Sequence, residues 1–209
     1  MLTELFLSAF VTLFVVIDPP GCAPIYAGLT KGASPAQARS MALRATMIAS
    51  VILLIFALFG QQLLGALHIA LDSFRIAGGL MLFFIAFDMV FEKRTQRREE
   101  RAEKIAQTPE IEDVSVFPMA MPMLAGPGAI AAVMLLMNEA GGEPERIAQV
   151  LGALAAVLVI TAAALVAAGP LIRLLGDKVE AVITRLLGVL LAALAAQYVI
   201  DGLKGSFGL

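Results

Sequence analysis

The chain has 209 residues, of which 60% are hydrophobic and only 15% are charged, and its formal net charge is −2. This composition excludes an ordinary soluble domain, whose apolar share is about 45–50%, and a nucleic-acid-binding protein, which needs a basic surface to contact phosphates. With one cysteine and one histidine, the chain cannot form an internal disulfide, a multi-thiolate zinc site or a two-thiol redox centre. We therefore expect no metal site and no cofactor.

Thirteen of the formal charges lie between Glu92 and Asp113. Elsewhere the sequence contains long uncharged runs, such as Ala45–Leu71, Val114–Asn138 and Ile147–Ile172. Each run exceeds the roughly 20 residues that a helix needs to cross about 30 Å of hydrocarbon. The sequence therefore predicts an all-α, polytopic integral membrane protein.

Charges and helix breakers predict six membrane spans. In chain order they cover approximately 2–29, 41–64, 73–91, 116–138, 147–172 and 181–203. The N-terminal apolar stretch lacks the positive flank and small-residue cleavage site of a secretory signal. We therefore expect it to be the first span.

Lysine and arginine residues are distributed unequally between the loops. Twelve of them lie in or beside the loops on one side, and three, namely Arg75, Arg146 and Lys204, lie on the other side. Because cytoplasmic loops retain positive charge during insertion, both termini are expected outside and the charged segment in the cytoplasm. We expect a multi-pass protein of a bacterial inner (plasma) membrane, with periplasmic termini in a Gram-negative host.

The charged segment divides the chain into two similar halves. Residues 1–91 are expected to form a first three-helix repeat, residues 92–115 a cytoplasmic linker, and residues 116–209 a second three-helix repeat. Because three is odd, the second half begins on the opposite side of the membrane, so the halves would be inverted repeats. Short sequence matches support this: Pro20-Gly21 aligns with Pro127-Gly128, and Arg75 aligns with Arg185.

Each half places a helix break in its first span, at Asp18–Pro24 in the first half and near Gly126–Gly128 in the second. Proline and glycine prevent a regular helix there. Backbone groups freed inside the bilayer are tolerated only beside protein or a wet cavity. Two breaks in inverted halves therefore predict a central substrate site, although a pair of packing kinks is the alternative.

Asp18 is the strongest candidate for chemistry, because a carboxylate inside the bilayer must be protonated, paired or hydrated. It would bind a substrate ammonium or carry a coupling proton, or it would only cap the following half-helix. The half-helix starts at both breaks are expected to present N–H groups to a substrate carboxylate. The substrate-binding candidates are Asp18, Pro20, Gly21, Cys22, Pro24, Gly126, Pro127, Gly128 and Gln197.

Arg75 and Arg185 occupy matching positions in spans three and six. Each begins a face of small residues, which predicts close helix packing. The two arginines, together with Asp18, are the candidates for coupling and gating; the arginines would clamp a carboxylate or pair with an aspartate. The aspartates considered are Asp18, Asp88 and Asp201. The alternative is that the arginines extend to lipid headgroups.

Four motifs resemble a known family. They are Asp18-Pro-Pro-Gly21-Cys-Ala-Pro24, Arg75-Ile-Ala-Gly-Gly79, Ala120-Met-Pro-Met-Leu-Ala-Gly126-Pro127-Gly128, and Arg185-Leu-Leu-Gly188 followed by Gln197 and Gly202. Together they resemble the MarC family of bacterial inner-membrane proteins, and the resemblance covers nearly the whole chain. Some members of this family are similar to transporters of small neutral amino acids such as glycine and alanine.

We therefore expect a proton-coupled secondary transporter of small neutral amino acids that works by alternating access. The substrate class rests on the family resemblance, and the site architecture rests on the paired breaks. The alternative is a non-transporting membrane protein that binds or regulates a partner through residues 92–113. An enzyme is not expected, because Cys22 has no second cysteine at the matching position and no paired aspartate motif is present. Faces of glycine and alanine would permit a homo-oligomer.

Overall fold

The computed structural model describes residues 2–91 and 113–208, with side chains described for residues 4–91, 113–169 and 182–208. All regular structure in the described residues is helical. The helices are α1 (Leu2–Ile17), α2 (Pro19–Leu29), α3 (Pro35–Ala66), α4 (Leu71–Val90), η1 (Ser115–Leu124), α6 (Pro127–Glu139), α7 (Pro144–Val166) and α8 (Ala168–Phe207). Nearly all of the predicted charged linker, residues 92–112, lies outside the described residues.

Five segments of the described chain are long and apolar enough to cross a membrane, when α1 and α2 are counted as one segment. Helices η1 and α6 together add a sixth if they form one bent span. Large apolar side chains such as Phe84, Met47 and Val159 are exposed on the outer faces of these helices. This exposure is what a bilayer requires and what water would disfavour.

Three helix bounds differ from the predicted spans by six residues or more. The largest difference is in α8, which begins at Ala168 rather than near residue 181. Helix α3 begins six residues before the predicted residue 41, at Pro35, because Ser34 and Gln37 form a capping box at its start. Helix α7 ends at Val166 rather than near residue 172. Pro170 has no N–H to donate to the carbonyl of Val166, so α7 cannot continue past this point. Pro170 instead lies in the first turn of α8, where a proline is tolerated.

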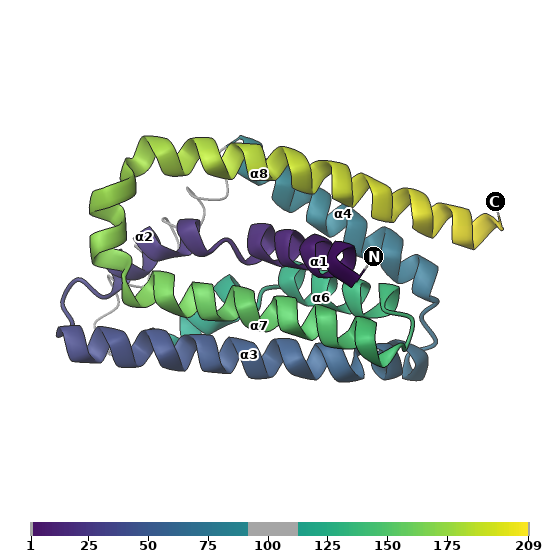
Figure 1. Ribbon diagram of the computed structural model, residues 1–209, viewed down its shortest axis with the longest axis horizontal. Coiled ribbons are helices and arrows are strands. Elements are labelled where there is room, and N and C mark those ends of the chain that lie inside the picture. The colour runs from purple at the N-terminus through teal and green to yellow at the C-terminus, as the bar shows by residue number, and fades with distance from the viewer. Residues whose placement is uncertain (1, 92–112, 209) are drawn as a thin grey trace.

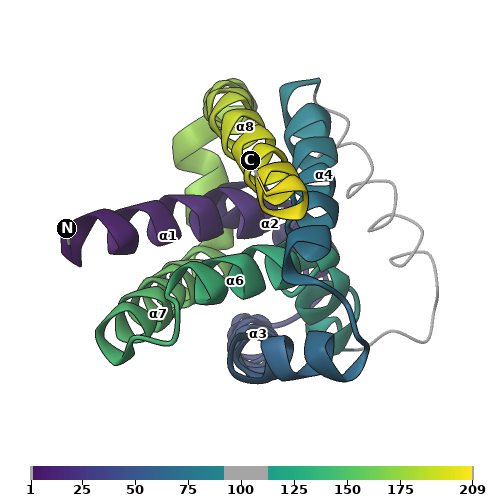
Figure 2. The ribbon, with the colours of Figure 1, turned by 90° about the vertical axis from the view of Figure 1, so that its right-hand side faces the viewer.

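The helices form three layers (Figures 1 and 2). Helices α4 and α8 lie on one side, α3 and α7 lie on the other, and α1, α2 and α6 lie between them. The α2–α3 and α7–α8 connections lie at one end of the bundle, whereas the α3–α4 and α6–α7 connections lie at the end toward which both termini point (Figure 1). We call these the α2–α3 end and the α3–α4 end.

Helices α4 and α8 make the most extensive helix pair, and glycines on both helices allow it. A Cβ atom on Gly79 would lie 2.9 Å from the backbone oxygen of Ala195, and one on Gly188 would lie 3.2 Å from the backbone oxygen of Ala86. The close helix packing predicted from these small-residue faces is confirmed. The pair therefore moves most easily as one unit, because separating it would open both backbone contacts.

Candidate functional site

Helices α1 and α2 meet at Asp18, which has a left-handed backbone conformation with φ 60° and ψ 64°. Aspartate and asparagine tolerate this conformation better than most residues with a side chain. The Asp18 side chain is buried, and its Oδ1 accepts a hydrogen bond of 3.1 Å from the amide of Gly21. A Cβ atom on Gly21 would lie 2.4 Å from this carboxylate, so the cap requires glycine there.

The C-terminal end of α1 lies at the same junction. Because α2 begins with two prolines, the carbonyls of Val15 and Val16 cannot receive the usual helical hydrogen bond. The carbonyl of Ile17 accepts a hydrogen bond of 3.4 Å from the thiol of Cys22. The negative end of the α1 dipole therefore lies beside the carboxylate of Asp18.

The second junction lies between η1 and α6, whose axes are bent by 52°. Phe117 and Met121 interrupt η1 with extended backbone angles. Gly126 allows the turn, because a Cβ atom there would lie 2.3 Å from the backbone oxygen of Pro122. Helix α6 then begins at Pro127, and no side-chain hydrogen bond caps it, so the positive end of its dipole lies at this turn.

The two junctions lie against each other in the middle layer. A Cβ atom on Gly128 would lie 3.6 Å from Cγ1 of Val16, and 2.2 Å from Cδ1 of Ile85 in α4. Gly128 and Ala129 are both buried. The structure therefore brings the C-terminal end of α1 next to the N-terminal end of α6.

Helix α2 differs from the expectation that its first amides are free to bind a substrate. Its first two residues are prolines, which have no N–H. The amide of Gly21 donates to the Asp18 side chain, and the amide of Cys22 donates to the Asp18 carbonyl at 3.0 Å. Pro20 and Pro24 are partly buried in this helix. The described amides at the start of α2 therefore already have partners within the helix.

The remaining predicted site residues, apart from Pro127, lie on α4 and α8 rather than at the junctions. Arg75 donates at 2.8 Å to Asp72 and at 2.8 Å to Asn138, rather than to Asp18, Asp88 or Asp201. Gln197 is exposed and donates to Asp201 one turn further along α8. Arg185 is exposed on α8, and Pro127 is exposed at the start of α6.

Arg75 belongs to a group of polar residues that we call the outer cluster, because the sequence predicts that the α3–α4 end faces outward. Its members are Asp72, Arg75, Asn138, Glu139, Arg146, Tyr198 and Asp201. The hydroxyl of Tyr198 lies close enough to the carboxylate of Glu139 to interact with it, and Arg146 donates at 2.7 Å to the backbone oxygen of Glu139. The end of α6 is therefore tied to α4, α7 and α8.

Sequence analysis missed Glu139 as a site residue. The sequence pattern at this position was weak, because Asn138-Glu139 ends a long uncharged run. Such a pattern is equally typical of an ordinary helix end at the membrane surface. Its partner Tyr198 lies 59 residues further along the chain, so no local spacing connects the two.

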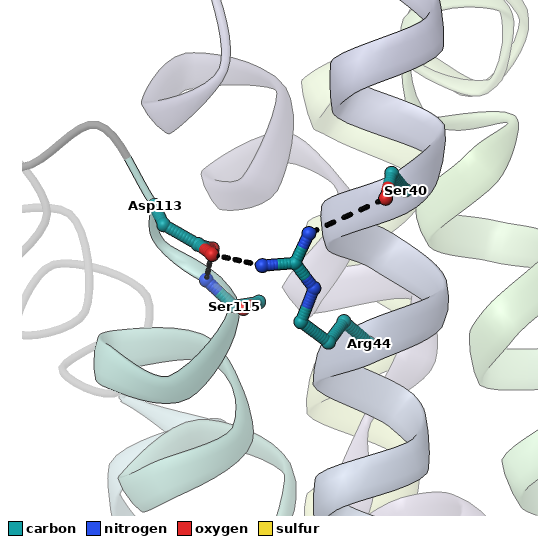
Figure 3. Close-up of polar contacts among 4 residues, drawn as sticks. All are labelled: Ser40, Arg44, Asp113 and Ser115. Carbon is teal, nitrogen blue, oxygen red and sulfur yellow. Dashed lines mark hydrogen bonds and ion pairs between the residues drawn. The ribbon is translucent and has the colours of Figure 1, made fainter.

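The α2–α3 end contains a polar pocket of about 570 Å³. It is lined by Leu29, Gly32, Ala33, Gln37, Ser40, Met41, Arg44, Asp113 and Val114. On its wall, Arg44 forms an ion pair with Asp113 and also contacts Ser40 (Figure 3). Hydrogen bonding from Ser115, whose amide donates to the Asp113 carboxylate at 2.9 Å, and the Arg44 guanidinium hold the pKa of Asp113 below its usual range, although partial burial opposes this.

Comparison with known proteins identifies the family. The model of the MarC family of integral membrane proteins matches residues 3–207. The chain belongs to the MarC family. A UPF0056 membrane protein of Archaeoglobus fulgidus is 36% identical over 95% of this chain and 92% of its own length. The UPF0056 membrane protein YvbG of Bacillus subtilis is 32% identical over 99% and 98%, and YhcE of Escherichia coli is 32% identical over 95% and 91%.

No solved structure matches the chain. Within residues 2–91 and 113–208, no group of three or more histidine, cysteine, aspartate or glutamate side chains has the arrangement of a metal site. The names of the MarC relatives give no substrate, so a function has to be argued from the junctions and the two ends of the bundle.

Proposed function

We propose that this MarC family protein is a secondary transporter of small neutral amino acids that is driven by protons. The two junctions would bind the substrate, and the two halves would rearrange around them by alternating access. The contact between the two junctions, at Val16 and Gly128, is the observation that carries the proposal. It joins two irregular backbone segments at the centre of an apolar bundle, where such segments are tolerated only beside protein or a wet cavity.

The proposed binding mode matches a zwitterion. The uncapped start of α6 would hold the substrate carboxylate at its positive dipole end. The carboxylate of Asp18 and the negative end of α1 would hold the substrate ammonium. The residues at the junctions are small, including Gly21, Cys22 and Ala129, which favours glycine and alanine over substrates with large side chains.

The helix packing supports the proposed inverted repeat. Helix α1 packs on α7, and its counterpart in the second half, η1 with α6, packs on α3. Helix α4 packs on its own counterpart α8. If each helix is replaced by its counterpart in the other half, every one of these helix pairs becomes a pair that is also present. A two-fold axis in the membrane plane would require this.

The two ends of the bundle differ, as alternating access requires. The α2–α3 end has a polar pocket of about 570 Å³, whereas side-chain links from three helices close the outer cluster around the end of α6. The proposed state is therefore open toward the predicted cytoplasmic side and closed on the other.

Uptake by proteoliposomes tests the proposal. The full chain would be reconstituted in proteoliposomes, and uptake of labelled glycine, alanine, leucine and glutamate would be measured. The measurement would be made without a pH gradient and with a lumen that is more acidic or more alkaline than the medium. We expect gradient-dependent flux of glycine and alanine and little flux of the larger or charged substrates. Absence of flux for all four, from protein that is shown to be folded, would exclude amino acid transport.

A further inference from the structure

The outer cluster joins parts of the molecule that alternating access has to separate. Helices α4 and α8 form one closely packed unit, and the end of α6 lies beside that unit in the middle layer. Arg75 of α4 links the unit to Asn138, and Tyr198 of α8 links it to Glu139. Opening this end of the bundle must therefore break both links.

Glu139 is the central acid of the cluster. The charged or titratable groups that act on its carboxylate are Tyr198 and Asp201 of α8, Arg75 of α4 and Arg146 of α7. Arg75 also pairs with Asp72 at 2.8 Å, and Arg146 donates to the Glu139 backbone oxygen rather than forming a direct ion pair with its carboxylate. Glu139 is thus held by contacts to three other helices.

The net charge of the outer cluster favours the binding of one proton. Two guanidiniums, Arg75 and Arg146, face three carboxylates, Asp72, Glu139 and Asp201. The ionised cluster has one excess negative charge, so one added proton makes it neutral. Asp72 is already engaged by Arg75, and Asp201 accepts a hydrogen bond from Gln197, whereas Glu139 connects separate helices.

We propose that Glu139 is the site where the coupling proton binds, and that protonation of its carboxylate releases the α4–α8 pair from the end of α6. The proposal rests on the proposed transport function, whose coupling step it assigns to a residue. The ionised carboxylate attracts the hydroxyl of Tyr198 and both arginines. Protonation removes this charge, and hydrogen bonds between neutral groups are about half as strong as charge-assisted ones.

Cys22 provides the reporter for the test, because it is the only cysteine in the chain and is fully buried at the α1–α2 junction. Cells that express the full chain would be treated with a membrane-impermeant thiol reagent at about pH 7.5 and about pH 5.5. The rate at each pH would be divided by that of free cysteine, because thiolate content falls with pH. We expect the normalised rate for the wild type to rise at the lower pH.

The variant Glu139→Gln mimics the protonated side chain. It should label at least about tenfold faster than wild type at the higher pH, which corresponds to a larger open population, and its rate should not depend on pH. The matched control is Glu145→Gln, an exposed acid in the first turn of α7, which should behave as wild type. A wild-type rate and pH response in Glu139→Gln would overturn the proposal.

Two further measurements keep the test decisive. If Glu139→Gln does not fold, Tyr198→Phe removes the link to α8 while keeping the acid, and wild-type labelling of that variant would overturn the proposal. In proteoliposomes, Glu139→Gln should exchange substrate across the membrane but lose accumulation driven by a pH gradient. Retained gradient-driven accumulation would reject the role of Glu139 but not the transport function. Absence of any flux in the wild type would reject the transport function itself.

Discussion

Val16 at the end of α1 lies in contact with Gly128 at the start of α6, since a Cβ atom on Gly128 would lie 3.6 Å from Cγ1 of Val16. The two residues are 112 positions apart in the sequence. Their contact places two helix ends of opposite polarity side by side. It also leaves little room for a larger side chain, which makes the contact open to a direct test.

The first prediction concerns Gly128→Ala. The added Cβ would lie 2.2 Å from Cδ1 of Ile85, so the substitution should lower the free energy of unfolding by about 1–3 kcal/mol through overpacking. Ile85→Val removes Cδ1 and should recover part of this loss in the double variant. Reaction of Cys22 with a thiol-reactive dye during heating measures the effect, because this single buried cysteine reacts once the chain unfolds. Equal losses in the single and double variants would contradict the contact.

A second prediction concerns the α4–α8 pair. In Gly79→Ala the new Cβ would lie 2.9 Å from the backbone oxygen of Ala195, and backbone cannot move aside as a flexible side chain can. The variant should lose about 1–3 kcal/mol of stability. The control is Gly65→Ala in α3, where a Cβ atom would meet nothing within 4 Å; it should be neutral or slightly stabilising. The same thermal measurement compares them.

The sequence predicted the helical class and most helix positions because the bilayer enforces long uncharged runs, and charges or prolines mark their ends. It did not predict the partners of polar side chains. For Arg75 the sequence left open a carboxylate clamp, a pair with a distant aspartate or extension to headgroups. The side chain instead contacts Asp72 one turn earlier in its own helix and Asn138 in α6. Contacts between separate helices depend on how the helices rotate and pack, which no local pattern encodes.

The same limit applied to the candidate site. Proline and glycine predict helix breaks from local sequence alone, because these residues act on the backbone wherever the helix lies. Gln197 was a predicted substrate-binding residue, but it is exposed and bonds to Asp201 on its own helix. Whether a helical residue faces the core or the lipid depends on packing that the uniformly apolar sequence conceals.

A third prediction concerns pH and the ion pair between Arg44 and Asp113. Because the native structure lowers the pKa of Asp113, the ionised carboxyl stabilises the fold above its ordinary range, and this contribution is lost as the pH falls through the lowered value. The side chains are 51% and 42% exposed, so the contribution should be below about 1 kcal/mol. Asp113→Asn should therefore be slightly less stable than wild type at neutral pH. The difference should disappear in acid; a difference that grows on acidification would contradict this assignment.

The last prediction separates the two roles of Asp18. Asparagine tolerates the left-handed backbone and keeps an Oδ1 that can accept the Gly21 amide, so Asp18→Asn should unfold at nearly the wild-type temperature. Asp18→Ala loses the cap and should be destabilised by about 1–2 kcal/mol. If the carboxylate also holds the substrate ammonium, Asp18→Asn should show weaker glycine uptake with a raised KM, while its response to the pH gradient remains, because the proton binds at Glu139. Wild-type KM in Asp18→Asn would limit Asp18 to capping α2, and loss of the gradient response with an unchanged KM would move the coupling proton from Glu139 to Asp18.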